Sequence, residues 1–146
     1  MTDGQQKNIE NIYPLSPMQQ GLLFQCLLAN NNEAYIPQIV LTLRGEIDSA
    51  MLGQAWQRSI DRYAVLRSGI FWEERDDPFQ VVYQGVSASF VPLEWSNDTL
   101  ASSSERLGAF LVANRQTGFD LRRPPLIRAH LISLADQVSY FVICYH

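Results

Sequence analysis

The C-terminal residues contain the feature that most constrains the fold, which is a pair of strongly apolar runs separated by a short polar segment. The runs Ile127–Leu134 and Val138–Tyr145 are dense in Val, Ile, Leu, Phe and Tyr, and they flank Ala135-Asp136-Gln137. Residues of these types favour strands, and the polar segment between them favours a hairpin. The second run is apolar on both faces, so we expect it to be an interior strand of a sheet.

A helix start precedes these strands near the N-terminus. Ser16 can cap a helix, Pro17 fits the first helical position, and Gln19 can complete a capping box. The apolar stripe predicted for this helix consists of Met18, Leu22, Leu23, Cys26, Leu27 and Ala29. The polar run Asn30–Asn32 is expected to end the helix.

The patterns between these ends alternate between strand and helix. They predict, in chain order, a strand over 39–43, a helix from Asp48 to Tyr63, a hairpin of 68–74 and 79–84 around Asp76-Asp77-Pro78, a weaker strand over 89–93, and a helix that begins at a Ser102–Glu105 capping box and ends before Gly118. This order predicts an α/β fold with a mixed sheet flanked by helices. Residues 1–11 are polar without periodicity and predict a flexible lead-in, so that 12–146 form the folded unit.

Composition excludes several classes of function. The chain has 146 residues, of which 47% are hydrophobic, so it can fill one core. Lys and Arg total 11 against 15 Asp and Glu, which disfavours nucleic acid or an anionic membrane as the main partner. We find neither a signal peptide nor an apolar run long enough to span a bilayer, and we expect a cytoplasmic location.

The chemistry-bearing side chains form no familiar catalytic or metal pattern in the sequence. Cys26 and Cys144 lie among apolar neighbours without CxxC spacing, so they are interpreted as small core residues. His130 and His146 lack further ligands at suitable spacing, so no metal site is expected. The sequence also contains no phosphate-binding loop and suggests no nucleophile paired with a histidine.

Three segments resemble the core motifs of nonribosomal peptide synthetase condensation domains. Residues 12–24, which include Tyr-Pro-Leu-Ser-Pro-Met-Gln, resemble the first motif. Residues 61–71 resemble the second, Arg-His-Glu-x-Leu-Arg-Thr-x-Phe, although Tyr, Ala and Ser replace its His, Glu and Thr. Residues 118–128 resemble a Phe-Asp-Leu segment followed by Pro-Leu-x-Arg. By the same resemblance, His146 corresponds to the first histidine of the third motif, His-His-x-x-x-Asp-Gly.

The resemblance implies a fold like the N-terminal lobe of chloramphenicol acetyltransferase, truncated here. A bare chain end after a buried strand supports that expectation, because it would place a charge beside the core. The complete domain would join a donor acyl or peptidyl thioester to an acceptor amine, each carried on the phosphopantetheine arm of a carrier protein. We therefore expect no directly bound cofactor or metal, and we expect carrier proteins, the C-terminal lobe and other synthetase modules as partners.

The resemblance also assigns roles to particular residues. The second histidine of the third motif is absent, so we expect this chain to be inactive alone and His146 to support the site rather than catalyse. Arg67 or Arg62 would pair with the aspartate of that motif and would lack this partner here; the alternative is a surface arginine at a helix end. Ser16 and Gln19 would approach the tunnel, although helix capping already explains both.

Two alternative functions stay open. The chain could be a non-catalytic folded lobe that binds a carrier protein or another synthetase segment. A sibling reaction on the same scaffold, epimerisation or ester formation, is also compatible with Tyr63 and Ala64 in the second motif.

Overall fold

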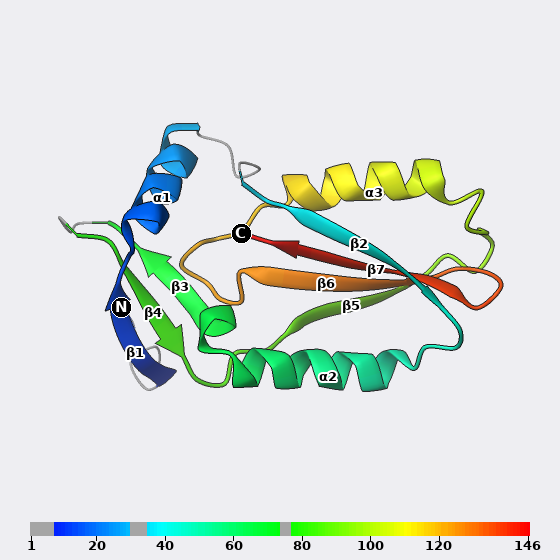
Figure 1. Cartoon of the computed structure of the whole chain (residues 1–146), viewed down its shortest axis with the longest axis horizontal. Helices are drawn as coiled ribbons and strands as arrows, with labels where there is room; N and C mark the ends of the chain where they lie inside the picture. Colours follow the sequence, from blue (N-terminus) through cyan, green and yellow to red (C-terminus); the bar gives the residue numbers. More distant parts are fainter. Residues whose placement is uncertain (1–7, 30–34, 74–76) are drawn as a thin grey trace.

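The computed structural model describes residues 8–29, 35–73 and 77–146, which form two sheets and their flanking helices (Figure 1). The elements are, in chain order, β1 (Ile9–Pro14), α1 (Pro17–Ala29), β2 (Gln38–Arg44), α2 (Ser49–Arg62), the short 3-10 helix η2 (Ala64–Arg67), β3 (Ser68–Phe71), β4 (Phe79–Tyr83), β5 (Ser89–Glu94), α3 (Ser104–Gln116), β6 (Ile127–Ser133) and β7 (Val138–Tyr145). The predicted α/β class with a mixed sheet flanked by helices is confirmed.

The larger sheet has four strands in the order β2-β7-β6-β5. β5 runs parallel to β6, and the other pairs are antiparallel, so the sheet is mixed. The expected interior strand is β7, which lies between β2 and β6. The hairpin turn holds Asp136 and Gln137 at φ of 58° and 54°, the left-handed backbone that a tight β6–β7 connection requires.

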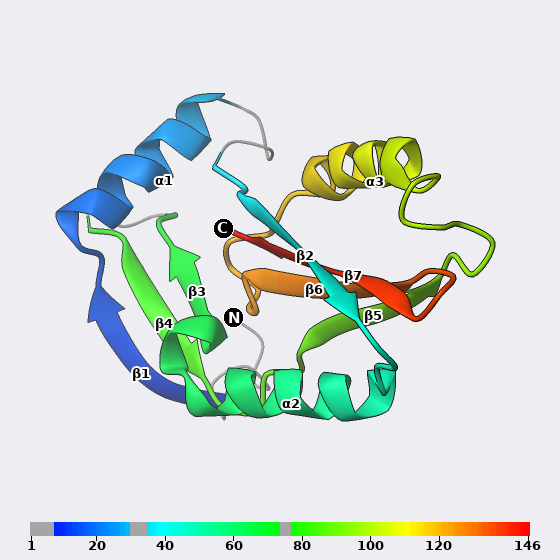
Figure 2. The same ribbon diagram turned by 45° about the vertical axis from the view of Figure 1, so that its right-hand side comes forward.

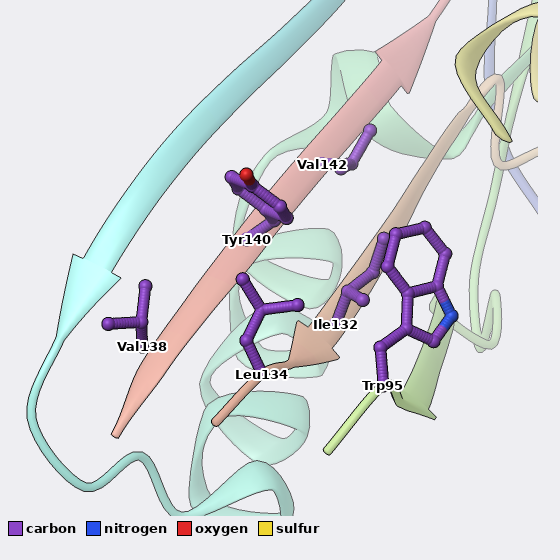
Figure 3. Packing of buried hydrophobic residues seen from close by; sticks show 6 residues of the cluster. All are labelled: Trp95, Ile132, Leu134, Val138, Tyr140 and Val142. Carbon is purple, nitrogen blue, oxygen red and sulfur yellow. The ribbon is translucent and has the colours of Figure 1, made fainter. Parts of the chain in front are cut away.

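The two faces of this sheet are covered by different helices, as Figures 1 and 2 show. Trp56 of α2 meets Phe141 of β7 edge to face, with ring centroids 5.8 Å apart. Neighbouring strand residues point to opposite faces, so Tyr140 and Val142 face α3 instead. The buried cluster on the α3 side consists of Trp95, Ile132, Leu134, Val138, Tyr140 and Val142 (Figure 3).

The smaller sheet has three antiparallel strands in the order β1-β4-β3 and lies beside the larger one (Figure 2). Leu23 of α1 packs in a second buried cluster with Leu15 and Leu121. The segment around Leu121 also joins β3, because the Ile70 N–H donates to the Leu121 carbonyl at 2.7 Å. Gly69 permits this approach, since a Cβ there would lie 2.9 Å from the Arg122 carbonyl oxygen.

Two of the predicted helix starts are confirmed. Asp48 caps α2 by accepting a hydrogen bond from the Met51 N–H at 2.9 Å. At α1, the Gln19 N–H donates to Ser16 Oγ at 3.3 Å, while the Ser16 N–H donates to Gln19 Oε1 at 2.8 Å. This reciprocal pair is the expected capping box.

The capping box predicted at Ser102 and Glu105 is wrong. The N-cap of α3 is Ser103, which is fully buried and makes no capping hydrogen bond with its side chain. The Ser103 hydroxyl instead contacts the Tyr140 hydroxyl at 2.8 Å, which ties the helix start to β7. Ser102 closes a local turn by accepting a hydrogen bond from the Thr99 N–H.

Two further expectations need correction. The flexible lead-in predicted over 1–11 is wrong for residues 9–11, which begin β1 and pair with β4; residues 1–7 lie outside the described residues.

The stripe predicted for α1 is largely exposed, with Met18 at 77% and Leu27 at 46%, because only Leu23 reaches the second cluster deeply. The Asn30–Asn32 run also lies outside the described residues.

Candidate functional site

The candidate site lies where the two sheets meet, around the residue that follows β7. The His146 N–H donates to the Leu126 carbonyl at 3.0 Å, which fixes this end of the chain to the start of β6. Figures 1 and 2 place this C-terminus between α1 and the four-stranded sheet. His146 lines two cavities of about 450 Å³ and about 300 Å³.

The first of these, which we call the polar cavity, is lined by Cys26, Leu27, Trp72, Glu73, Thr117, Phe119, Asp120, Leu121, Arg122 and His146. Arg122 ties two of its walls together, since its guanidinium lies 3.2 Å from a carboxylate oxygen of Glu73 and 3.2 Å from one of Asp120. Burial works to raise the pKa of the Asp120 carboxyl, but hydrogen bonds and charge from Arg122, with the charge of Arg123, leave that pKa below its usual value. Asp120 is therefore ionised at neutral pH.

The second, which we call the apolar cavity, is lined mostly by aliphatic side chains. Its lining residues are Gln19, Leu22, Val65, Leu66, Ser68, Ile70, Gln80, Leu126, Ile127, Tyr145 and His146. Gln19 thus has two roles, since it closes the capping box of α1 and also borders this cavity. Ser16 caps the helix but is not among the residues that line either cavity.

His146 also contacts a cysteine, which the sequence did not indicate. Cys26 Sγ of α1 lies 3.4 Å from His146 Nε2, within hydrogen-bond distance for sulfur. Burial raises the pKa of the Cys26 thiol and lowers the pKa of the His146 imidazole. Both groups are consequently neutral at neutral pH.

Arg67 is a buried arginine that contacts two backbone carbonyls and one carboxylate. Its Nε–H donates to the Ile60 carbonyl at 3.0 Å, and its Nη1 contacts both the Tyr83 carbonyl and the Glu10 carboxylate. The alternative of a surface arginine is therefore wrong for Arg67, whereas the pairing with an aspartate of the third motif stays a prediction. The guanidinium joins α2, β4 and β1 at the edge of the smaller sheet.

Unlike the buried Arg67, Arg62 lies on the surface of the molecule. It is exposed in the last turn of α2, where a positive charge suits the helix dipole. Its guanidinium lies 5.7 Å from the ring centroid of Tyr63. These observations match the interpretation of a surface arginine at a helix end.

Residues 9–146 match the sequence profile of the family described as "Condensation domain". The chain belongs to the condensation domain family. Among its relatives it is 36% identical to one of the linear gramicidin synthase subunits from Brevibacillus parabrevis and 30% identical to bacitracin synthase 3 of Bacillus licheniformis. These matches span 98% and 94% of the chain but only 3% and 2% of the two synthases.

Solved condensation domains have the same fold. The first condensation domain of the CDA synthetase matches with a TM-score of 0.83 at 16% identity, over 94% of this chain and 35% of that one. The starter condensation domain of rhizomide synthetase matches with a TM-score of 0.80 at 21% identity, over 94% of this chain and 34% of that one. The chain therefore spans about a third of these solved condensation domains, in their chloramphenicol acetyltransferase-like fold.

Arg128 of the condensation domain's Pro-Leu-x-Arg segment is a supporting residue whose role sequence reasoning missed. Its Nε–H donates to Asn114 Oδ1 at 2.8 Å, and its Nη1 donates to the Gly118 carbonyl at 2.6 Å. The guanidinium also lies over the Phe119 ring, 4.3 Å from its centroid. Arg128 thereby holds the Phe-Asp-Leu segment, and with it one wall of the polar cavity, against β6.

No cluster of three or more His, Cys, Asp or Glu suited to a metal ion occurs in the ranges 8–29, 35–73 and 77–146. Within the same ranges, no helix is long and apolar enough to cross a membrane. His130 packs edge to face against Phe110 at 5.1 Å between ring centroids, and its Nδ1 is buried without a hydrogen-bond partner. Burial, helped by the charge of Arg128, lowers the pKa of this imidazole.

Proposed function

We propose that this chain is part of a condensation domain that forms amide bonds between two carrier-bound substrates in nonribosomal peptide synthesis. The observation on which this rests is that one histidine, His146, borders two separate cavities. A reaction between a donor thioester and an acceptor amine needs room for both molecules on either side of one central group. The family membership of residues 9–146 supports the same reaction.

Amide formation from a thioester requires that the amine attack the carbonyl carbon, lose a proton and expel the thiol. The protein can help by aligning the two reactants and by stabilising the developing oxyanion. No cofactor is needed for this chemistry, because the thioester is already activated. We propose that both substrates arrive on the phosphopantetheine arms of carrier proteins, which would be the main partners.

In this proposal His146 supports the amide-forming site and is not the group that acts on the amine. Its backbone N–H is held by the Leu126 carbonyl, and its side chain contacts Cys26. A histidine directly after His146 would therefore start from an anchored strand end. That second histidine would act on the amine as a base or as a positioning group.

Arg67 supports the site from a distance. Its contacts with Glu10 and with the Ile60 and Tyr83 carbonyls hold the smaller sheet in place. The neighbouring Ser68 and Leu66 line the apolar cavity. An aspartate of the third motif would have to share Arg67 with Glu10.

The coding sequence beyond His146 tests the proposal at once. We expect it to continue with His-x-x-x-Asp-Gly in frame. A stop codon at that point in the natural gene would overturn the proposed catalytic function, because no second histidine would follow.

A non-catalytic lobe is the second candidate, and exposed apolar side chains of α1 favour it. Met18, Phe24 and Leu28 are 77%, 61% and 68% exposed. A pull-down with phosphopantetheinylated carrier protein tests this candidate. Retention of the carrier by the isolated chain, together with a stop codon after His146, would favour the binding role; no retention would exclude it.

A further inference from the structure

Cys26 and His146 form a thiol and imidazole pair at the wall of the polar cavity. Their Sγ and Nε2 atoms lie 3.4 Å apart, and both residues line the same space of about 450 Å³. The other cysteine, Cys144, is completely buried in β7. Cys26 is therefore the thiol that a reagent entering this cavity would meet.

Both groups are neutral, so a reaction at Cys26 requires its proton to move to the neighbouring imidazole as the thiol attacks. Burial lowers the pKa of His146, so its imidazole is neutral near pH 7 and can accept a proton. Burial raises the pKa of Cys26, so little thiolate is present without that help. The reactivity of Cys26 should consequently depend on its neighbour, as for other thiols activated by a base.

We propose that Cys26 is a nucleophile that accepts acyl groups from thioesters, with His146 as its base. In the step, Cys26 Sγ attacks the thioester carbonyl carbon while its proton moves to His146 Nε2. A new bond joins Sγ to the acyl carbon, the original carbon–sulfur bond breaks, and the departing thiolate takes the proton from His146. One thioester is exchanged for another, so no oxidant, reductant or metal is required.

The cavity suits a short or medium acyl chain. Leu27, Trp72 and Phe119 provide apolar and aromatic surface beside Cys26, and Thr117 adds a hydroxyl to the lining. The choice of thioesters as the natural acyl source rests on the proposed function, because that function brings carrier-bound thioesters to this site. The reactivity of the pair itself depends only on the geometry of Cys26 and His146.

The test uses the chain itself and acetyl N-acetylcysteamine thioester as the probe. Intact mass spectrometry follows acylation with time, and peptide mapping identifies the modified cysteine. We expect one acetyl group on Cys26, no acylation of Cys26→Ser, and at least a roughly hundredfold slower reaction in His146→Gln, which is the low end of the contribution of a general base. The control variant His130→Gln changes the other histidine of this chain, and it should react at the rate of the unchanged chain.

Comparison with the unfolded chain covers the case in which a variant does not fold. We expect Cys26 of the native chain to be acylated faster than Cys26 of the same chain in guanidinium chloride, where His146 is no longer held beside it. The proposal would be overturned if Cys26 of the native chain reacted no faster than Cys26 of the unfolded chain. It would also be overturned by acylation of Cys144 in the native chain, or by full reactivity of a folded His146→Gln.

The proposed function is tested separately. Cys26→Ser in a longer protein that contains this chain removes the thiol without touching His146. Amide formation that persists in this variant, while Cys26 in the unaltered protein resists acylation, would reject the nucleophile and retain the condensation reaction. Acylation of Cys26 without any amide formation would retain the nucleophile and reject the condensation reaction.

Discussion

The two sheets of this molecule differ in how deeply their side chains are buried. The four-stranded sheet places β7 in its interior and has helices on both faces, and Ile132 and Val142 are completely buried. The three-stranded sheet has one buried cluster of Leu15, Leu23 and Leu121, and the helix beside it exposes most of its apolar side chains. The better packed sheet is therefore the scaffold of the molecule.

The site lies at the junction of these two regions. His146 extends from the scaffold through β7, whereas Cys26 and Gln19 come from α1 on the open side. A rigid strand thus supplies the central histidine, and the less buried region supplies most of the surroundings. A histidine at the end of a strand in the better packed sheet is held more precisely than one on a loop would be.

Truncation of a core side chain should give the largest effect and should differ between the two sheets. We expect Ile132→Ala to lower the free energy of unfolding by about 3–4 kcal/mol and Leu23→Ala by about 2 kcal/mol, since the second site has fewer neighbours. Urea unfolding followed by circular dichroism measures both. A larger loss for Leu23→Ala would reverse the comparison.

The scaffold is also the part of the fold that the sequence predicts best. Strand patterns such as Val138–Tyr145 are local and strongly apolar, so both the strand and its interior position follow from the sequence alone. β1 was missed because Asn11 and its polar neighbours become a strand only through pairing with β4. The N-cap of α3 was misplaced by one residue because Tyr140, distant in sequence, takes the Ser103 hydroxyl.

Loss of the buried arginine should come next in size. Arg67→Met would leave the Glu10 carboxylate and the Ile60 and Tyr83 carbonyls without this donor, and we expect it to cost about 2–3 kcal/mol. Arg62→Met is the matched control, because an exposed arginine contributes at most about 0.5 kcal/mol. Equal stabilities of the two variants in urea would show that the Arg67 contacts do not hold the smaller sheet.

Acidification should give a smaller effect, which arises in the four-stranded sheet through His130 on β6 and His146 after β7. The pKa values of His130 and His146 are lowered in the folded chain, mainly by burial, so the unfolded chain binds protons more readily. The stability is therefore complete above about pH 6.5, the ordinary pKa of histidine, and decreases as the pH falls from there towards the folded values.

Thermal unfolding between pH 7.5 and 5.5 measures this dependence, and the variant His130→Gln/His146→Gln is its control. We expect the melting temperature of the unchanged chain to decrease over this range and that of the variant to change less. The lowered pKa of Asp120 places its contribution at a more acidic pH, so it should not contribute here. Parallel curves for the two proteins would contradict the assignment.

Substitution on the open helix should change stability least. Met18→Ser removes a side chain that is 77% exposed, so we expect a change within about 0.5 kcal/mol. The same exposed surface favours self-association. Met18→Ser combined with Phe24→Ser and Leu28→Ser should therefore reduce self-association, as measured by sedimentation velocity. An unchanged distribution of sedimentation coefficients would mean that self-association uses another surface.

The candidate site was only partly predictable, and the reason is again distance along the chain. His146 and Gln19 follow from motifs, which are local in sequence. The contact between Cys26 and His146 joins the first helix to the last strand, and the Arg128 contacts join β6 to Asn114 and Gly118. Side chains brought together in this way leave no periodic or spacing signal. For Arg128, the one indication in the sequence was a charged side chain next to apolar residues on a predicted strand.

The central proposal is that this chain supports an amide-forming site to which a histidine directly after His146 would contribute. The most direct test compares the isolated chain with a longer protein in which the chain continues through His-x-x-x-Asp-Gly, using donor and acceptor substrates loaded on carrier proteins. Mass spectrometry of the released product measures amide formation. We predict a product with the longer protein and its loss when the second histidine is replaced by Ala, with none from the isolated chain. Turnover by the isolated chain, or by the longer protein without that histidine, would contradict the account.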